Sequence, residues 1–150
     1  VDATRAVSCN EYYLLLQSGF KLTKESVYRF SEHDYNIQET GVYVKSDYYR
    51  QHRSACEKFA KASRQGWEWT AQHPKEALDI VMKYVRKYAS PTNRLLQRLM
   101  LEECLRLQVN KDTGKREYRV REDMVQKASR MMTECGLIAR PVSYKELMGL

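Results

Sequence analysis

The stretch that decides the fold is SACEKFAKASRQGWEWTAQHPKEALDIVMKYV, residues 54–85. Apolar residues recur there every three or four positions, the period of one helix face, at Ala55, Phe59, Ala62, Gly66 and Trp69. This helix should end at His73, because the residue before a proline disfavours helical angles. Pro74 in turn suits the first turn of a following helix. The stretch therefore predicts two consecutive helices that meet at His73 and Pro74.

Further helices are expected on both sides of this stretch. A short one covers residues 10–19, and Gly19 is suited to end it. A longer helix opens at Pro91, another spans about 121–135, and residues 144–147 form a last turn. The inward faces of these helices should bury six side chains in particular: Phe59, Trp69, Leu78, Val81, Leu99 and Met131.

Extended segments are few and short. Residues 27–30 and 42–44 have the pattern of short strands, and the polar segment 31–40 between them is typical of a crossing connection. The sequence thus predicts an α/β fold that helices dominate. Two or three such strands cannot form a sheet that the helices could cover on both faces. We therefore expect the chain to be a fragment of a larger domain, and the start at Val1, without a methionine, favours the same interpretation.

The composition indicates a globular domain, with 43% hydrophobic and 11% aromatic residues. No apolar run approaches the roughly 20 residues of a membrane-spanning helix. A net charge of +7 would allow a nucleic-acid or anionic-membrane partner. The basic excess lies on the later helices at spacings typical of solvated faces, so we expect no nucleic-acid partner.

Signatures of catalysis and of metal binding are missing. The three histidines lack the i, i+4 spacing of helical metal ligands: His33, His52 and His73. No Gly-rich phosphate loop and no nucleophile elbow is present. The four cysteines form no Cys-x-x-Cys pair, so that two disulfides remain possible but reduced or buried thiols are favoured: Cys9, Cys56, Cys104 and Cys135. We expect no enzyme activity, no cofactor and no metal.

The polar residues before the first helix are the best candidate for a binding site. Asn10, Glu11 and Tyr12 stand where a helix N-terminus offers free N–H groups beside side chains that can distinguish donors from acceptors on a small heterocycle. Such a set suits an amine or pyrimidine ligand. The alternative is ordinary helix capping, with Tyr12 packed in the core.

Aromatic residues supply further candidates. Tyr35 and Tyr43 flank the crossing segment, where the ligand of a two-lobed protein usually binds. Trp67 and Trp69 lie two residues apart and hence on separate sides of their helix. One of them should be in the core; the other could line a cleft, although packing between helices is favoured.

Residues 66–77, GWEWTAQHPKEA, resemble a distinctive segment of the substrate-binding proteins for thiamine-pyrimidine precursors and their nitrate, sulfonate and taurine relatives. The order of other segments is similar, namely Val1-Asp2-Ala3, then Asn10-Glu11-Tyr12-Tyr13, then Gly41-Val42-Tyr43-Val44. Over roughly residues 1–147 the chain thus resembles the C-terminal portion of a type 2 periplasmic substrate-binding protein.

The resemblance implies a partial type 2 periplasmic-binding-protein fold, in which two α/β lobes joined by crossing strands close on a ligand. Residues 1–30 would form the end of the second lobe and residues 31–41 the hinge crossing. Residues 42–150 would return to the first lobe as helices. Asn10, Glu11 and Tyr12 would lie nearest the ligand, with Tyr35 or Tyr43 on the hinge side.

The function that the resemblance implies is binding of a small nitrogen-containing solute, such as a thiamine-precursor-like pyrimidine, for an ABC-type importer. The membrane subunit of that importer would be a partner, and the location would be the periplasm or cell envelope. An acidic excess in residues 1–40 favours a cationic or hydrogen-bond-donating ligand over nitrate or sulfonate. The alternative is a ligand-sensing or protein-interaction module of a larger signalling protein. As a fragment with exposed apolar stripes, the chain should form a homodimer.

Overall fold

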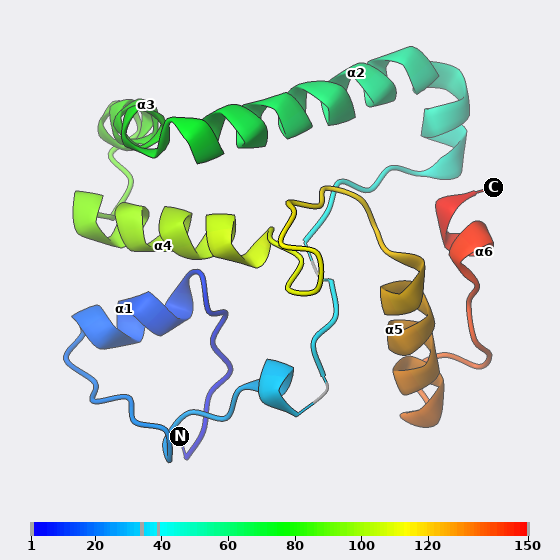
Figure 1. Ribbon diagram of the computed structural model, residues 1–150, viewed down its shortest axis with the longest axis horizontal. Helices are drawn as coiled ribbons and strands as arrows, with labels where there is room; N and C mark the ends of the chain where they lie inside the picture. Colours follow the sequence, from blue (N-terminus) through cyan, green and yellow to red (C-terminus); the bar gives the residue numbers. More distant parts are fainter. Residues whose placement is uncertain (1, 34, 39, 150) are drawn as a thin grey trace. The chain divides into compact units, whose positions relative to one another are not determined.

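The computed structural model of the chain describes residues 2–33, 35–38 and 40–149. Val1, in the predicted strand end, and Asp34 and Glu39, in the predicted crossing segment, lie outside the described residues. Helices make up more than half of the described part, as Figure 1 shows. Its elements are α1 (Glu11–Gln17), a 3₁₀ helix η1 (Phe30–Glu32), α2 (Ser46–Gln72), α3 (Pro74–Lys87), α4 (Arg94–Leu107), α5 (Glu122–Glu134) and α6 (Tyr144–Met148).

The prediction that helices dominate is confirmed, but the predicted strands at 27–30 and 42–44 are wrong. Residues 27–29 and 41–45 have no regular structure, and Phe30 begins η1. Within the described residues, β pairing is limited to one antiparallel bridge between Val109 and Arg116. Alternating side chains alone do not make a strand, because its backbone groups need a neighbouring strand as partner.

The helix boundaries follow local chemistry. The predicted junction between α2 and α3 at His73 and Pro74 is confirmed. Helix α4 begins at Arg94 rather than at Pro91, because the side chain of Asn93 accepts a hydrogen bond from the N–H of Leu96 at 2.9 Å and so caps the first turn. The start of α4 is therefore set by the capping side chain of Asn93 and not by Pro91.

The end of α1 also agrees with the prediction. Gly19 has a positive φ of 87°, and its N–H donates to the carbonyl of Leu16 at 3.1 Å. The next N–H, of Phe20, donates to the carbonyl of Leu15 at 3.1 Å. This pair of bonds is the Schellman arrangement, in which a glycine in the left-handed region closes a helix.

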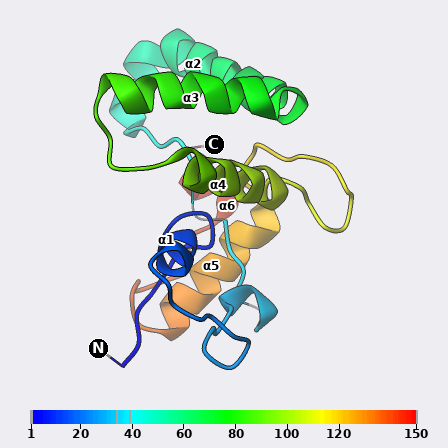
Figure 2. The ribbon, with the colours of Figure 1, turned by 90° about the vertical axis from the view of Figure 1, so that its left-hand side faces the viewer.

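The chain divides into two compact units, and the boundary between them falls within α2. The first unit comprises the chain up to Val27 together with Ala62–Tyr118. In it α3 packs against α4 and α1 packs against α4, as Figures 1 and 2 both show. Its buried apolar side chains come from α3 and α4: Ala77, Leu78, Met82, Leu96 and Leu105. The amide of Asn93 also donates to the side chain of Gln17 at 3.1 Å, which fixes the end of α1 beside the start of α4.

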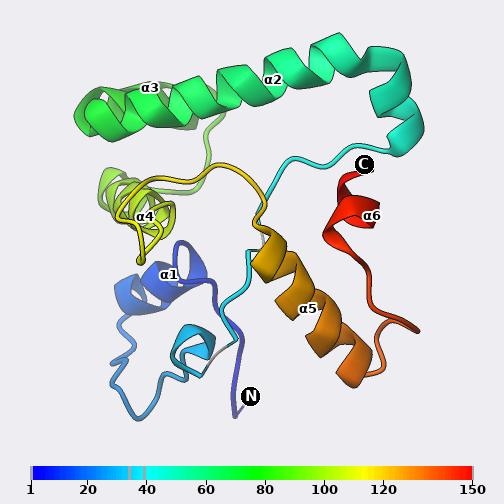
Figure 3. The same ribbon diagram turned by 45° about the vertical axis from the view of Figure 1, so that its right-hand side comes forward.

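The second unit comprises Tyr28–Lys61 together with the chain from Arg119 onward. Here α5 contacts α6, and the two helices lie side by side in Figure 3. The hydroxyl of Ser129, buried on α5, accepts a hydrogen bond from the N–H of Val142. The amide of Gln38 donates to the carbonyl of Arg119 at 3.1 Å and accepts from the N–H of Arg121 at 2.8 Å. Side-chain hydrogen bonds thus take the place of a strand pairing in this unit.

The predicted core was only partly right. Leu78 is buried at 5% exposure, and Leu99 and Met131 are half-buried. Phe59, Trp69 and Val81 were predicted to be buried and are 59%, 41% and 39% exposed. Trp67 is 37% exposed, so neither tryptophan is in the core. Periodicity predicted that one face of α2 lies against a core, but no described residue of α2 is buried.

Candidate functional site

The segment before α1 folds back onto the first turn of that helix. The carbonyl of Val7 accepts hydrogen bonds from the N–H groups of Asn10 at 3.1 Å and Tyr12 at 3.2 Å. The carboxylate of Glu11 accepts one from the N–H of Val7 at 3.0 Å. Hydrogen bonds from the backbone N–H groups of Glu11 itself and of Val7 lower the pKa of the Glu11 carboxyl, so this group is ionised near neutral pH.

These hydrogen bonds limit how Asn10, Glu11 and Tyr12, the three predicted site residues of this segment, can bind a ligand. The N–H groups of Asn10, Tyr12 and Tyr13 have partners within the protein, so the expectation of free N–H groups at this helix start is wrong for these three. The physical reason is that the chain turns back at Val7 and supplies its own acceptors. Asn10 occupies the N-cap position, but its side chain makes no capping hydrogen bond. Recognition of a ligand here would therefore rest on the side chains.

Tyr12 is half-buried rather than fully packed in a core. Its ring lies edge-on to that of Tyr13, with centroids 5.5 Å apart. The structure therefore supports the capping alternative only in part. The Glu11 carboxylate accepts a hydrogen bond from the preceding loop, whereas the Asn10 side chain makes no capping hydrogen bond. Asn10, Glu11 and Tyr12 lie together at one end of α1 in the first unit.

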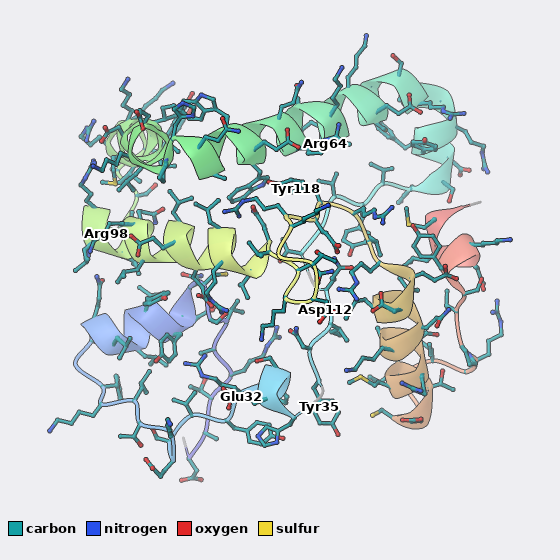
Figure 4. The ribbon with its side chains drawn as sticks, viewed as in Figure 1. Glu32, Tyr35, Arg64, Arg98, Asp112 and Tyr118 are labelled. Atoms are coloured by element: carbon teal, nitrogen blue, oxygen red, sulfur yellow. The ribbon has the colours of Figure 1, made fainter. Side chains whose placement is uncertain are left out.

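Tyr35 and Tyr43 belong to the second unit, so the five predicted site residues divide three and two between the units. Both are exposed, at 51% and 67%. Tyr35 lies next to η1, as Figure 4 shows, with its ring edge-on to Phe30 at 6.4 Å. Tyr28 meets Phe30 edge-on at 5.4 Å and stacks on His33 at 4.2 Å. We call Tyr28, Phe30, His33 and Tyr35 the aromatic cluster.

Sequence reasoning found one member of the aromatic cluster, Tyr35, and missed the other three. The available signal was the density of rings at positions 28, 30, 33 and 35, which the misassigned strand at 27–30 obscured. An exposed set of rings offers flat faces on which a planar heterocycle can stack. The aromatic cluster therefore has the chemistry of a ligand contact.

The first unit contains an open hollow of about 340 Å³. Its lining comes from α2 and from the segment after α4: Glu68, Ala71, Gln72, Arg116 and Tyr118. Figure 4 shows Tyr118 on the side of its segment that faces α2. The hydroxyl of Tyr118 is buried without a hydrogen-bond partner among the described residues. Sequence reasoning missed the hollow because residues 68–72 and 116–118 come together only in the fold.

A family model described as NMT1/THI5 like matches residues 1–77, slightly more than half of the chain. The chain belongs to the NMT1/THI5-like family. The resemblance based on residues 66–77 is thereby confirmed. A search of curated proteins and a search of solved structures each found no match.

The NMT1/THI5-like match covers α1, the aromatic cluster and all five predicted site residues, and it ends at Ala77 in α3. Proteins of this family are generally binding proteins rather than enzymes, and their ligands are small-molecule solutes. The family is typically periplasmic or otherwise extracytoplasmic. Membership in the NMT1/THI5-like family therefore supports a solute-binding role for this chain.

Three observations bear on other features of this NMT1/THI5-like chain. Among residues 2–33, 35–38 and 40–149, no three or more His, Cys, Asp or Glu side chains are grouped so that they could hold a metal ion. In the same described part, no helix has the length and apolar character needed to cross a membrane. The four cysteines are free thiols; Cys135 is exposed, and the other three are half-buried.

Proposed function

We propose that this chain holds a small nitrogen-containing solute, such as a thiamine-precursor-like pyrimidine, for an ABC-type importer. The observation that carries the proposal is the NMT1/THI5-like match, which covers the polar residues at α1 and the exposed rings at 28–35 together. An aminopyrimidine presents N–H donors, ring acceptors and a flat face. The polar residues of the first unit offer counterparts to the donors and acceptors, and the exposed rings of the second unit offer flat faces for stacking.

Glu11 is the residue with the best-defined role in this proposal. Its carboxylate is held by the N–H of Val7 at 3.0 Å, and its lowered pKa keeps it ionised. An ionised carboxylate accepts strong hydrogen bonds from an amino group or a protonated ring nitrogen. The amide of Asn10, which makes no capping bond, supplies a donor and an acceptor beside it. Tyr12 completes the polar group.

Tyr35 and Tyr43, in the second unit, offer exposed rings on which a planar heterocycle can stack. Tyr35 is part of the aromatic cluster and is half-exposed at 51%. Tyr43 is 67% exposed, and its ring lies against Gly41, where an added Cβ would come within 3.2 Å of it. Stacking on such rings favours an aromatic heterocycle over nitrate or sulfonate, because the face of an aromatic ring carries negative charge density that repels an anion.

The finer parts of the proposal come from the family. Residues 1–30 would end the second lobe of a type 2 fold, residues 31–41 would be the hinge crossing, and residues 42–150 would return to the first lobe. A membrane subunit of the importer would be the protein partner, and the periplasm or cell envelope would be the location. These assignments rest on the resemblance and on the family's usual role.

A second candidate function is a ligand-sensing or protein-interaction module within a larger signalling protein. It is favoured by apolar side chains left exposed on α2 and α3 within the first unit, where Trp67 is 37%, Ile80 44% and Tyr84 54% exposed. The same surface supports association into a homodimer.

Light scattering after gel filtration tests the homodimer. A mass near 36 kDa is expected from the chain mass of 17.8 kDa, and a stable 18 kDa monomer would contradict it.

Titration calorimetry tests the solute-binding proposal. Purified protein is titrated with an aminopyrimidine, with nitrate and with taurine. Saturable binding of the aminopyrimidine alone is expected. Binding of only the anions would contradict the ligand class, and binding of none of them would favour the interaction module.

A matched pair of variants locates the site. Glu11→Gln removes the charge but keeps an acceptor for Val7, so the loop should persist while affinity for the aminopyrimidine falls by about tenfold or more. Glu134→Gln, an exposed glutamate at the end of α5, makes the same charge change away from the site and should bind normally. Equal affinities for the two variants, with unchanged thermal stability, would show that Glu11 makes no ligand contact.

A further inference from the structure

The hollow of the first unit has no role in the proposed solute binding, and its size and lining suit a ligand of its own. Its volume, about 340 Å³, lies near the lower end of the range of roughly 300–1,000 Å³ that small-molecule sites occupy. Glu68, Ala71 and Gln72 line it from α2, where their i, i+3 and i+4 spacing places them on one face of the helix. Arg116 and Tyr118 line it from the segment after α4.

The segment after α4 is held to the end of that helix by hydrogen bonds. Val109 and Arg116 form an antiparallel bridge. The N–H of Glu117 donates to the carbonyl of Gln108 at 3.0 Å. In addition, Nη1 of Arg116 donates to the carbonyl of Leu105, a buried residue of α4. This wall of the hollow is therefore formed before any ligand binds.

The guanidinium of Arg116 has donors left for a ligand. Its hydrogen bond to Leu105 uses one nitrogen, and no carboxylate within the described part of the chain pairs with it. A guanidinium carries five N–H donors in a planar fork, which binds a carboxylate through two parallel hydrogen bonds. Arg116 therefore gives the hollow a positively charged group that matches a carboxylate.

The hydroxyl of Tyr118 is a second donor that lacks an acceptor. It is buried, and it has no hydrogen-bond partner among the residues that the structure describes. A buried polar group without a partner destabilises the folded state, so nearly all such groups in proteins are hydrogen-bonded. A ligand in the hollow can supply the acceptor that the described residues do not. A carboxylate suits Arg116 and Tyr118 together, because its two oxygens accept several hydrogen bonds.

The α2 wall of the hollow carries groups of the opposite kind. The Glu68 side chain is 50% exposed, and its contact with Arg64, which Figure 4 labels on α2, is an exposed pair at 3.7 Å that holds it only weakly. Its carboxylate can therefore accept hydrogen bonds from an ammonium group. The amide of Gln72 adds a donor and an acceptor, and Ala71 adds an apolar surface. Glu68 and Arg116 form no ion pair with each other in the described structure, so the hollow presents both charges.

We propose that this hollow binds a free α-amino acid with an apolar side chain. The carboxylate of the amino acid binds Arg116 and Tyr118, its ammonium group binds Glu68, and its side chain packs against Ala71 and the ring of Tyr118. A simple anion is disfavoured by the Glu68 carboxylate and a simple cation by the Arg116 guanidinium, so the zwitterion is selected over both. The lining includes none of the five predicted site residues. The inference therefore goes beyond the proposed solute binding and does not depend on it.

The experiment titrates L-leucine into isotope-labelled protein and follows the backbone amide signals by NMR. Saturable shifts are expected at residues 68–72 and 116–118, with a dissociation constant in the millimolar range or tighter. Two analogues are the ligand controls: isoamylamine lacks the carboxylate, and isocaproate lacks the ammonium group. Each should bind at least about tenfold more weakly than leucine, because one charged wall is left without its partner. An aminopyrimidine should not displace the leucine.

Two variants and two matched controls test the residues. Tyr118→Phe removes only the hydroxyl, so it should weaken leucine binding by about tenfold while Tm stays the same or rises, since no hydrogen bond within the described protein is lost. Arg116→Gln should weaken leucine binding at least as much. Tyr88→Phe, at the end of α3, and Arg98→Gln, on α4, make the same changes at exposed side chains and should bind leucine normally.

Four results would overturn the proposal: no saturable shifts with L-leucine, equal affinity for isocaproate or isoamylamine, unchanged leucine affinity in Tyr118→Phe, or displacement of leucine by the aminopyrimidine. The titration of the unaltered protein decides even if Arg116→Gln folds poorly. A lower Tm for Tyr118→Phe with unchanged affinity would show that the hydroxyl has a structural role instead. Leucine binding and aminopyrimidine binding are measured separately, so each proposal can fail without the other.

Discussion

Replacement of Arg106 by leucine should destabilise the protein much more than the same replacement of Arg98, although each arginine pairs with a glutamate on α4. Arg106 donates two hydrogen bonds to Glu103, at 2.7 and 2.6 Å, and the Glu103 side chain is only 10% exposed. Arg98 approaches Glu102 at 3.8 Å, and that side chain is 61% exposed. Figure 4 labels Arg98 on α4, and its side chain is 56% exposed.

The expected magnitude follows from this difference in burial. Loss of Arg106 leaves a nearly buried carboxylate without its two charge-assisted hydrogen bonds, a change that costs about 3–5 kcal/mol for fully buried pairs. Arg106 itself is 58% exposed, so water can replace part of the interaction, and we expect about 2 kcal/mol. Arg98→Leu should cost less than about 0.5 kcal/mol. Leucine and arginine have similar helix propensities, so α4 itself is not weakened.

Urea unfolding followed by circular dichroism measures both changes. With a slope of about 2 kcal/mol/M, the midpoint should fall by about 1 M for Arg106→Leu and hardly at all for Arg98→Leu. A double variant, Glu103→Leu with Arg106→Leu, should recover much of the loss because no charge is then left buried. Equal midpoints for the two single variants would refute the reasoning.

Three further predictions concern the core, a helix cap and an ion pair. Leu78→Ala should lower the free energy of unfolding by about 3 kcal/mol, whereas Phe59→Ala, at a side chain 59% exposed, should lower it by less than about 1 kcal/mol. Chemical unfolding that shows the larger loss for Phe59→Ala would contradict the observed burial of these two side chains. Asn93→Ala should cost about 1 kcal/mol through loss of the cap on α4, with Asn93→Asp retaining most of the stability in thermal melts. The hydrogen bond from Arg121 lowers the pKa of Asp123, so this pair should stabilise the fold above the unfolded carboxyl pKa and lose its effect as the pH falls through the folded value. An NMR titration should show the Asp123 pKa rising in Arg121→Leu, and an unchanged value would count against the pair.

Local signals in the sequence predicted the helices well because each boundary has a local cause. Pro74 separates α2 from α3, and Gly19 closes α1 in the left-handed conformation. The start of α4 was placed at Pro91 because a proline is a conspicuous helix start, whereas the cap at Asn93 depends on one side-chain hydrogen bond. The strand at 27–30 failed because its pattern was local and its partner would have had to come from elsewhere.

Prediction of the core and of the site from the sequence had the same limit, because both depend on contacts between elements that are distant in the sequence. Periodicity identified Phe59 and Trp69 as one face of α2, but whether a face is covered depends on elements distant in sequence. Asn10, Glu11 and Tyr12 could be found because they are adjacent in the chain. The hollow lined by Glu68, Arg116 and Tyr118 could not, since these residues come together only in the fold.

Equilibrium dialysis with a labelled aminopyrimidine tests the central claim, solute binding, most directly, because it counts bound ligand without relying on a heat or a spectroscopic change. If the chain binds this solute, the label should saturate near one ligand per chain, be displaced by unlabelled aminopyrimidine, and not be displaced by nitrate or taurine. Bound label that never exceeds a small fraction of the chains at millimolar ligand, in protein shown to be folded by circular dichroism, would contradict the claim.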